Sequence, residues 1–200
     1  MAYTAPTTRS TGDLITSTIW NTDMVDNIVY LKSSINAQIQ IPGGAWYPRV
    51  TTGAAPGSFE TTTNKNNFNT IDFSNTGGAL YAQFANELPA DYNGGTVTFH
   101  VNWTCQDAST NSVLFVMQAT SYSNDDTLDA AYGSAVGVVD ANLANGDLNK
   151  SAESAALTIA GAPAAGDTVL WQFYRSSGDA QDNLAATARV LSVTITYTRS

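Results

Sequence analysis

The first forty residues of this chain carry an apolar pattern that differs from that of the rest. Large apolar residues recur there at steps of three and four, at Trp20, Met24, Ile28, Leu31, Ile35 and Ile39. This spacing places all of them on one side of an α-helix. Thr16 or Ser17 is suited to cap the start of the helix, and we expect it to run to about Gln38, ahead of Pro42. One helix with one apolar stripe needs a surface that covers it.

The residues after Ile41 form short runs typical of β-strands, separated by Gly, Asn, Asp and Pro. Apolar residues alternate at Val97, Phe99, Val101, Trp103 and Cys105, and again at Leu191, Val193, Ile195 and Tyr197. Such alternation gives a sheet one buried face and one wetter face. Other strands are expected at 45–50, 68–73, 80–85, 112–120, 135–139, 155–160 and 169–173.

These patterns predict a mainly β protein with an N-terminal arm and a single α-helix, followed by an antiparallel, jelly-roll-like β-sandwich. The length of 200 residues suits one sandwich domain with a small appendage. We expect residues 1–41 to hold an extended arm and an anchoring or oligomerisation helix. Residues 42–200 are expected to form the sandwich domain.

The apolar stripe has two possible covers. The helix can pack on the chain's own sandwich, or it can associate with other copies or with a larger particle. Residues 1–15 are polar and rich in threonine, so they have no core of their own and favour an arm that threads across a neighbour. We therefore expect the stripe residues to serve oligomerisation or anchoring.

The composition opposes several classes of partner. Charged residues make up 12% of the chain, against about 25% in an average soluble domain, and the net charge is −9. An excess of acidic residues opposes binding to nucleic acid or to an anionic membrane, so neither partner is expected. The start of the chain has no signal-peptide pattern, and no apolar run approaches the roughly 20 residues of a membrane span. Synthesis in a cytosol is expected.

The single histidine and the single cysteine do not suggest catalysis. His100 lies on the polar side of its predicted strand, and no Gly-x-Ser-x-Gly turn offers it a nucleophile. One histidine and one cysteine cannot build the usual zinc sites, and Cys105 cannot form an internal disulfide. We expect no catalytic residues, no cofactor and no metal centre.

Two acidic groups occur in predicted loops. Asp125, Asp126 and Asp129 form one group, and Asp179 and Asp182 form the other. Carboxylates of this kind can bind calcium, but the ligand order of an EF-hand is absent, so solvation of these side chains is the simpler interpretation. No pair of carboxylates stands out for glycoside hydrolysis.

Aromatic residues near predicted loops and strand ends could form a platform for a sugar. These residues are Trp46, Tyr47, Tyr92, Tyr122 and Tyr132. The alternative is that each ring closes an end of the sandwich. Exposure of two or three coplanar rings on one face would favour carbohydrate binding.

Two segments resemble proteins of tailed bacteriophages. The stretch at 8–35 resembles the opening of many virion proteins, on the matching residues Gly12, Ile15, Thr16, Trp20, Asn21, Asp26, Asn27 and Leu31. The stretch at 166–197 resembles the closing strands of small phage β-sandwich domains, in its arginine followed by an aspartate-bearing loop and in the Ala-Arg-Val-Leu entry to the last strand. Similar proteins are tail fibres, head fibres and capsid decoration proteins, and many are trimers.

The resemblance implies a non-enzymatic structural protein of a phage particle, displayed on the virion surface and released by lysis. Its expected partners are further copies of itself, with a trimer favoured, and other capsid or tail proteins. A host surface glycan is a further candidate partner, because a carbohydrate-binding or receptor-binding module is the alternative function. A glycan hydrolase built on a β-sandwich is the third hypothesis.

Overall fold

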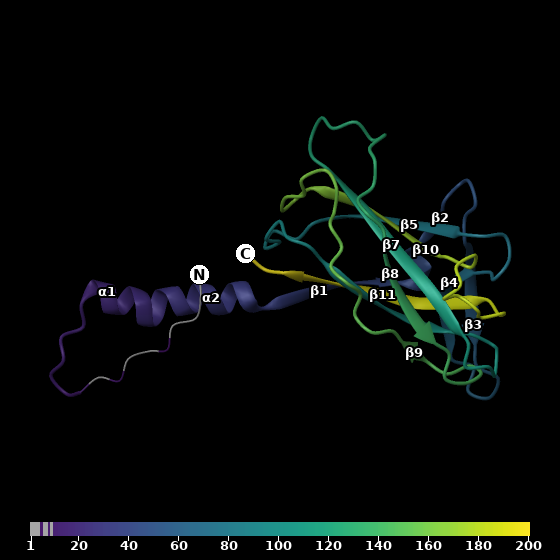
Figure 1. Cartoon of the computed structure of the whole chain (residues 1–200), viewed down its shortest axis with the longest axis horizontal. Helices are drawn as coiled ribbons and strands as arrows, with labels where there is room; N and C mark the ends of the chain where they lie inside the picture. Colours follow the sequence, from purple (N-terminus) through teal and green to yellow (C-terminus); the bar gives the residue numbers. More distant parts are fainter. Residues whose placement is uncertain (1–4, 6–7, 9) are drawn as a thin grey trace.

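Two antiparallel sheets face each other across a shared core, and a helix projects from one end of this sandwich (Figure 1). The computed structural model describes residues 5, 8 and 10–200. The helix has three consecutive segments, α1 (Ser17–Trp20), the π-helical η1 (Asn21–Asp26) and α2 (Asn27–Ser34). None of the described helices has the length and apolar character needed to cross a membrane. The predicted architecture, a helix followed by an antiparallel β-sandwich in a mainly β chain, is confirmed.

Sheet A has six strands and is organised around β11 (Ala188–Thr198). β6 pairs with β11 along one edge of that strand. Along the other edge, β4 pairs with the first part of β11 (188–190) and β1 pairs with the rest (192–198). The remaining strands of sheet A are β3 (Ala55–Glu60), β4 (Asn67–Phe73), β6 (Thr98–Thr104), β9 (Asn149–Lys150) and β1 (Asn36–Pro42). The last predicted strand therefore lies at the centre of a sheet.

Sheet B has five strands in the order β2-β5-β10-β7-β8. Their bounds are β2 (Tyr47–Pro48), β5 (Leu80–Glu87), β10 (Thr168–Arg175), β7 (Ser112–Tyr122) and β8 (Val136–Ala141). The run at 112–120 is apolar on both faces, and its strand is an interior one, paired with β10 and β8.

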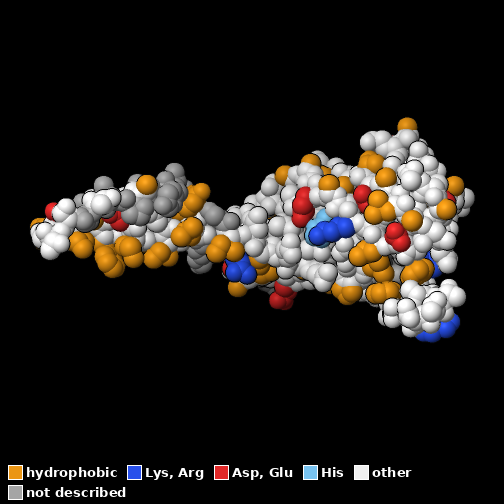
Figure 2. Space-filling model, turned by 90° about the horizontal axis from the view of Figure 1, so that it is seen from below, with side chains coloured by type: hydrophobic (Ala, Val, Ile, Leu, Met, Phe, Trp, Pro, Cys, Tyr) orange, Lys and Arg blue, Asp and Glu red, His pale blue; other side chains and the backbone are white. Residues whose placement is uncertain are grey.

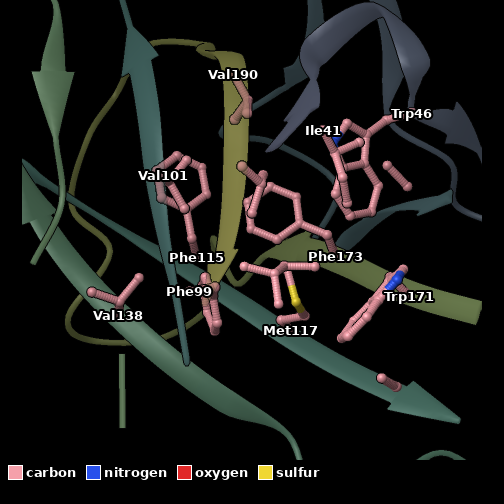
Figure 3. Packing of buried hydrophobic residues seen from close by; sticks show 14 of the residues in the cluster. Ile41, Trp46, Phe99, Val101, Phe115, Met117, Val138, Trp171, Phe173 and Val190 are labelled. Atoms are coloured by element: carbon pink, nitrogen blue, oxygen red, sulfur yellow. The ribbon is translucent and has the colours of Figure 1, made fainter. Parts of the chain in front are cut away.

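The core consists of the inward side chains of both sheets, with Phe173 of β10 near its centre (Figure 3). Its ring centroid lies 5.4 Å from that of Trp46, 5.4 Å from Phe73, 6.4 Å from Phe99 and 5.5 Å from Phe115. Tilted and edge-to-face contacts of this kind add to the hydrophobic gain of burying the rings. The alternation predicted at 96–105 is confirmed, because its apolar members are buried.

The helix is shorter than predicted. Thr16 caps its start, and its Oγ1 accepts a hydrogen bond from the Ile19 N–H at 3.3 Å. The helix ends at Ser34 instead of running to about Gln38, and the chain continues at once into β1. Ile39 therefore lies in β1, half-buried against the core and opposite Ile195 of β11, and it is not part of a helical stripe.

The division of the chain between residues 41 and 42 stays a prediction, although β1 runs across this boundary and pairs with β11 along its whole length. Much of the predicted arm at 1–15 lies outside the described residues, namely 1–4, 6–7 and 9.

One strand was not predicted from the sequence, and one predicted strand is wrong. The run at 55–60 contains Pro56 and Gly57, which are poor strand formers, yet it forms the edge strand β3. The segment 155–160 forms no strand of its own, but makes isolated bridges from Leu157 to Val97 and from Ala160 to Thr120.

The chain passes from sheet A to sheet B at Gly43, between β1 and β2. A β-carbon added there would lie 2.2 Å from the Val190 carbonyl oxygen and 3.0 Å from the Thr70 Cα, so only glycine fits. This close approach lets the next residues turn through a short 3₁₀ segment, η2 (Gly43–Ala45), and brings Trp46 into the core.

We expect Gly43→Ala to destabilise the fold by about 1–3 kcal/mol, because the backbone of β11 must move to admit the methyl group. Gly178→Ala is the matched control, since a β-carbon at that position meets nothing within 4 Å. Urea unfolding monitored by tryptophan fluorescence measures both. Equal stability of the two variants would contradict the tight crossing at Gly43.

Candidate functional site

The projecting helix exposes its large apolar side chains. Trp20, Met24, Ile28 and Leu31 of the helix, and Ile35 directly after it, each leave between 45% and 60% of their surface accessible, and Val25 and Val29 are exposed beside them. We call these seven residues the helix apolar surface. Figure 2 shows hydrophobic side chains in a row along the helix, which extends away from the sandwich. The stripe is thus not packed on the chain's own sheets, and its predicted role in assembly stays a prediction.

The π-helical segment widens the helix apolar surface. A π-turn holds more residues than an α-turn, so side chains that follow it are rotated around the helix axis. Within and after η1, the adjacent pairs Met24 and Val25, and Ile28 and Val29, are both exposed. The apolar surface is therefore a band rather than a single line of residues.

A groove of about 610 Å³ lies on the outer face of sheet A. Its lining comes from β1, the β3–β4 hairpin, β6, the β8–β9 loop (142–148) and β11. Figure 2 shows this face, with the single histidine in pale blue and hydrophobic side chains gathered to one side of it. We call this feature the sheet A groove.

A β-bulge in β11 shapes the floor of the groove. The pairing with β6 runs from Val190 opposite Trp103 to Ser192 opposite Asn102, which leaves Leu191 as an extra residue. As a result, Leu191 and Ser192 both line the groove, although neighbouring residues of a regular strand point to opposite faces. The sequence alternation predicted Leu191 on the buried side with Val193, and the bulge makes that prediction wrong.

Uncharged polar groups form the rest of the floor. The Asn102 side-chain amide donates a hydrogen bond to the Ser192 Oγ at 3.0 Å, which leaves the Asn102 carbonyl oxygen as an acceptor. Thr104 is buried, and its hydroxyl has no hydrogen-bond partner within the described part of the chain. A buried hydroxyl without a partner is unusual and calls for a physical explanation.

Two phenylalanines form a wall of the groove. Phe59 of β3 and Phe68 of β4 are directly opposite each other across the hairpin. Phe68 is 47% exposed, and the Phe59 ring reaches the β8–β9 loop, where a β-carbon at Gly146 would lie 3.7 Å from its Cζ. The Arg189 guanidinium carbon lies 5.9 Å from the centroid of the Phe59 ring, within the range of a cation–π contact.

The predicted aromatic platform is not assembled on one face. Trp46 and Tyr92 are buried, and Trp46 packs on Phe84 and Phe173 while the Tyr92 hydroxyl donates to the Gly95 carbonyl. The Tyr122 hydroxyl donates to the Leu128 carbonyl at 3.0 Å. Tyr92 and Tyr122 are thus bonded to their own loops, close to the alternative that the sequence left open, whereas Trp46 is part of the core between the sheets.

Tyr47 and Tyr132 belong to a cluster on the outer face of sheet B. Tyr47 is 45% exposed, whereas Tyr132 lies over the strands and its hydroxyl accepts a hydrogen bond from the Gln83 amide at 2.9 Å. Burial raises the pKa of Tyr132, and the hydrogen bond with Gln83 opposes this change. Arg49 stacks 3.7 Å over the centroid of the Tyr81 ring. The polar groups of this cluster are thus largely paired with one another.

The acidic loops serve the fold. The Asp126 carboxylate accepts a hydrogen bond from the Ser123 N–H, and Asp179 accepts one from the Gln181 N–H. A hollow of about 370 Å³ lies beside Asp125 and Asp126 and includes Asp167, whose carboxylate accepts from the Ala164 N–H. No group of three or more metal-binding side chains that could hold an ion occurs among the described residues.

Asp182 forms a buried ion pair with Arg175, and both side chains are 1% exposed. The two guanidinium hydrogen bonds to the carboxylate measure 2.8 and 2.6 Å. Arg175 also donates to the Ala186 carbonyl at 2.7 Å, and Asp182 accepts from the Leu114 N–H at 3.1 Å. This network ties the β10–β11 loop to both sheets.

The side chains of His100 and Cys105 are engaged in the fold: the first is hydrogen-bonded and the second is buried. The His100 Nδ1 lies 3.1 Å from a Glu153 carboxylate oxygen, which also accepts a hydrogen bond from the Thr196 hydroxyl at 3.3 Å. Cys105 is fully buried, and this burial raises the pKa of its thiol, which disfavours the reactive thiolate.

Comparison with known proteins finds only distant structural similarity at low sequence identity. No family model and no curated protein matches the sequence. The CBM36-1 domain of a multidomain xylanase from the hindgut metagenome of Trinervitermes trinervoides is 9% identical, with a TM-score of 0.45 over 80% of this chain and 96% of that chain.

Two further structures show the same range of similarity. The carbohydrate-binding module CBM36 in complex with calcium and xylotriose is 11% identical, with a TM-score of 0.39 over 78% of this chain and 97% of that chain. The enzymatically active domain of bacteriophage CBA120 tailspike protein 4 is 10% identical, with a TM-score of 0.37 over 82% of this chain and 20% of that chain.

We expect Asp182→Asn to cost about 3–5 kcal/mol of folding stability, because it leaves the buried Arg175 charge without its partner. Glu60→Gln is the control, since it breaks the exposed pair with Lys65 (3.5 Å) and is expected to change stability by less than about 1 kcal/mol. Chemical unfolding of the two variants decides the matter. A small effect of Asp182→Asn would mean that the β10–β11 loop does not depend on the ion pair.

Proposed function

We propose that this chain is a non-enzymatic bacteriophage virion protein, displayed on the particle surface as a capsid decoration, head fibre or tail fibre. The observation that best supports this proposal is the helix apolar surface, carried on a helix that projects away from the sandwich (Figure 1). The N-terminal stretch also resembles the opening of tailed-phage virion proteins, and two of the eight residues that carry this resemblance, Trp20 and Leu31, belong to the helix apolar surface.

Burial of the helix apolar surface would drive assembly. An isolated helix of this length is marginally stable in water, so it needs tertiary or intermolecular packing. Burying each large apolar side chain contributes about 1.5–3 kcal/mol before entropy costs. Helices from neighbouring copies, three in number on the family resemblance, would cover one another and present their sandwiches outward. Attachment to a capsid or tail protein would use the same end of the molecule.

A second candidate function is a carbohydrate-binding or receptor-binding module. The sheet A groove favours it, because the groove combines two aromatic rings with amide and hydroxyl groups on a solvent-facing sheet. The two functions are compatible, since the groove lies on the sandwich and the helix apolar surface lies outside it.

Replacing Ile28 or Leu31 by Asp is expected to dissociate the assembly and leave the sandwich folded, because both side chains belong to the helix apolar surface. Multi-angle light scattering gives the mass and circular dichroism follows the β signal. Val50→Asp is the control, since Val50 is fully exposed on the sandwich side of the chain.

The wild-type protein and Val50→Asp should share one oligomeric mass, and the helix variants should have that of a single chain. A monomeric wild-type protein, or an unchanged mass in both helix variants, would remove the support for assembly through the helix.

A further inference from the structure

We propose that the sheet A groove binds a short segment of a neutral, uncharged oligosaccharide. This inference deepens the second candidate function and is independent of assembly through the helix. It rests on three properties of the groove: its lack of ionised side chains, its aromatic wall, and a buried hydroxyl group without a partner.

The lining of the groove carries no charge. It consists of apolar side chains with neutral amides and hydroxyls, such as Gln40, Asn102 and Thr104, in a chain whose net charge is −9. A nucleic acid or an acidic glycan needs cationic side chains for its charges, and a basic peptide needs carboxylates. A neutral ligand has no such need.

The wall and floor match the two kinds of surface on a sugar ring. A pyranose presents C–H groups on its faces and hydroxyl groups around its edge. The exposed Phe68 ring and its cross-strand neighbour Phe59 offer an apolar surface for a C–H face. Asn102 and Gln40 offer donors and acceptors for the hydroxyl groups, and the volume lies within the range of small-molecule sites, about 300–1,000 Å³.

The Thr104 hydroxyl gives the most specific support. Four buried side-chain atoms lack a hydrogen-bond partner in the described part of the chain, namely Trp46 Nε1 and the hydroxyl oxygens of Thr104, Ser109 and Thr120, and Thr104 is the one of these residues that lines the groove. A buried polar group left unpaired is destabilising, and a ligand hydroxyl that pairs with it removes this cost. The β-bulge at Leu191 also shapes the site, because it places the adjacent residues Leu191 and Ser192 of β11 on the floor of the groove.

The cluster on the outer face of sheet B is the weaker candidate for the same ligand. Its Gln83 amide is paired with the Tyr132 hydroxyl at 2.9 Å and with the Gln172 carbonyl oxygen at 3.3 Å. Arg49 donates to the Thr52 hydroxyl at 2.8 Å. A sugar would have to displace these contacts, whereas the sheet A groove holds an unpaired hydroxyl group.

The test is isothermal titration calorimetry, which measures the affinity of the full chain for each ligand. The neutral ligands are xylohexaose, mannohexaose, cellohexaose and maltohexaose, and hexagalacturonic acid is the charged comparison. We expect binding of at least one neutral hexasaccharide and none of the acidic one. Phe68→Ala should weaken that binding about tenfold or more through lost apolar contact. Tyr47→Ala is the matched control, because Tyr47 (45% exposed) is as exposed as Phe68 (47%) but lies on sheet B.

Thr104→Val separates a binding role from a structural one. Removal of an unpaired buried hydroxyl should leave the melting temperature unchanged or higher, while the affinity for the neutral hexasaccharide falls about tenfold. A purely structural Thr104 would instead give a lower melting temperature in Thr104→Val and an unchanged affinity, and this result would contradict the binding role.

Three results would overturn the proposal: no binding of any of the four neutral hexasaccharides, preferential binding of the acidic one, or equal affinity in Phe68→Ala and the wild type. A lower oligomeric mass in Phe68→Ala would show that the groove is covered by another copy of the chain, which would also overturn it. Ile28→Asp and Leu31→Asp should keep the affinity per chain, so loss of assembly and loss of glycan binding are separately observable.

Discussion

The whole molecule depends on the pairing of β11 along both of its edges. This strand receives β6 on one side and both β4 and β1 on the other, so it joins segments that begin at residue 36 and end at residue 198. Its inward side chains, among them Val193 and Ile195, pack in the same core as Phe173 of sheet B. Because β1 continues directly from the helix, β11 also holds the projecting helix on the sandwich.

The inward alternation of the strands was predictable, and the places where it failed have physical causes. A two-residue period identified β6 and β10 because each has one side in the core. The helix was predicted from steps of three and four, and it was predicted too long because residues four apart, such as Ile35 and Ile39, share a side in a helix and also share a face in a strand. Only the pairing of β1 with β11, a contact distant in sequence, decides between the two.

The groove was not predictable in the same way. Its lining comes from five separate parts of the chain, and its floor depends on a bulge that local sequence does not reveal. The sequence suggested a sugar platform of tryptophan and tyrosine rings near loops, but several of those rings are buried or bonded to their own loops. Phe59 and Phe68 gave one usable signal, since they flank a polar run typical of a hairpin turn and would face each other across it.

A single residue, Ile35, separates the end of α2 from the start of β1. A long glycine- and serine-rich linker would let each sandwich search space independently, and its effective concentration for a second binding event would fall with linker length. A connection of one residue instead fixes the orientation of each sandwich relative to its helix through the backbone geometry. In an assembly of several copies, the sheet A grooves would then have a fixed spacing. Avidity for a repeating polymer would depend on how well this spacing matches the repeat of the polymer, so the assembly would select among polymers by their repeat length.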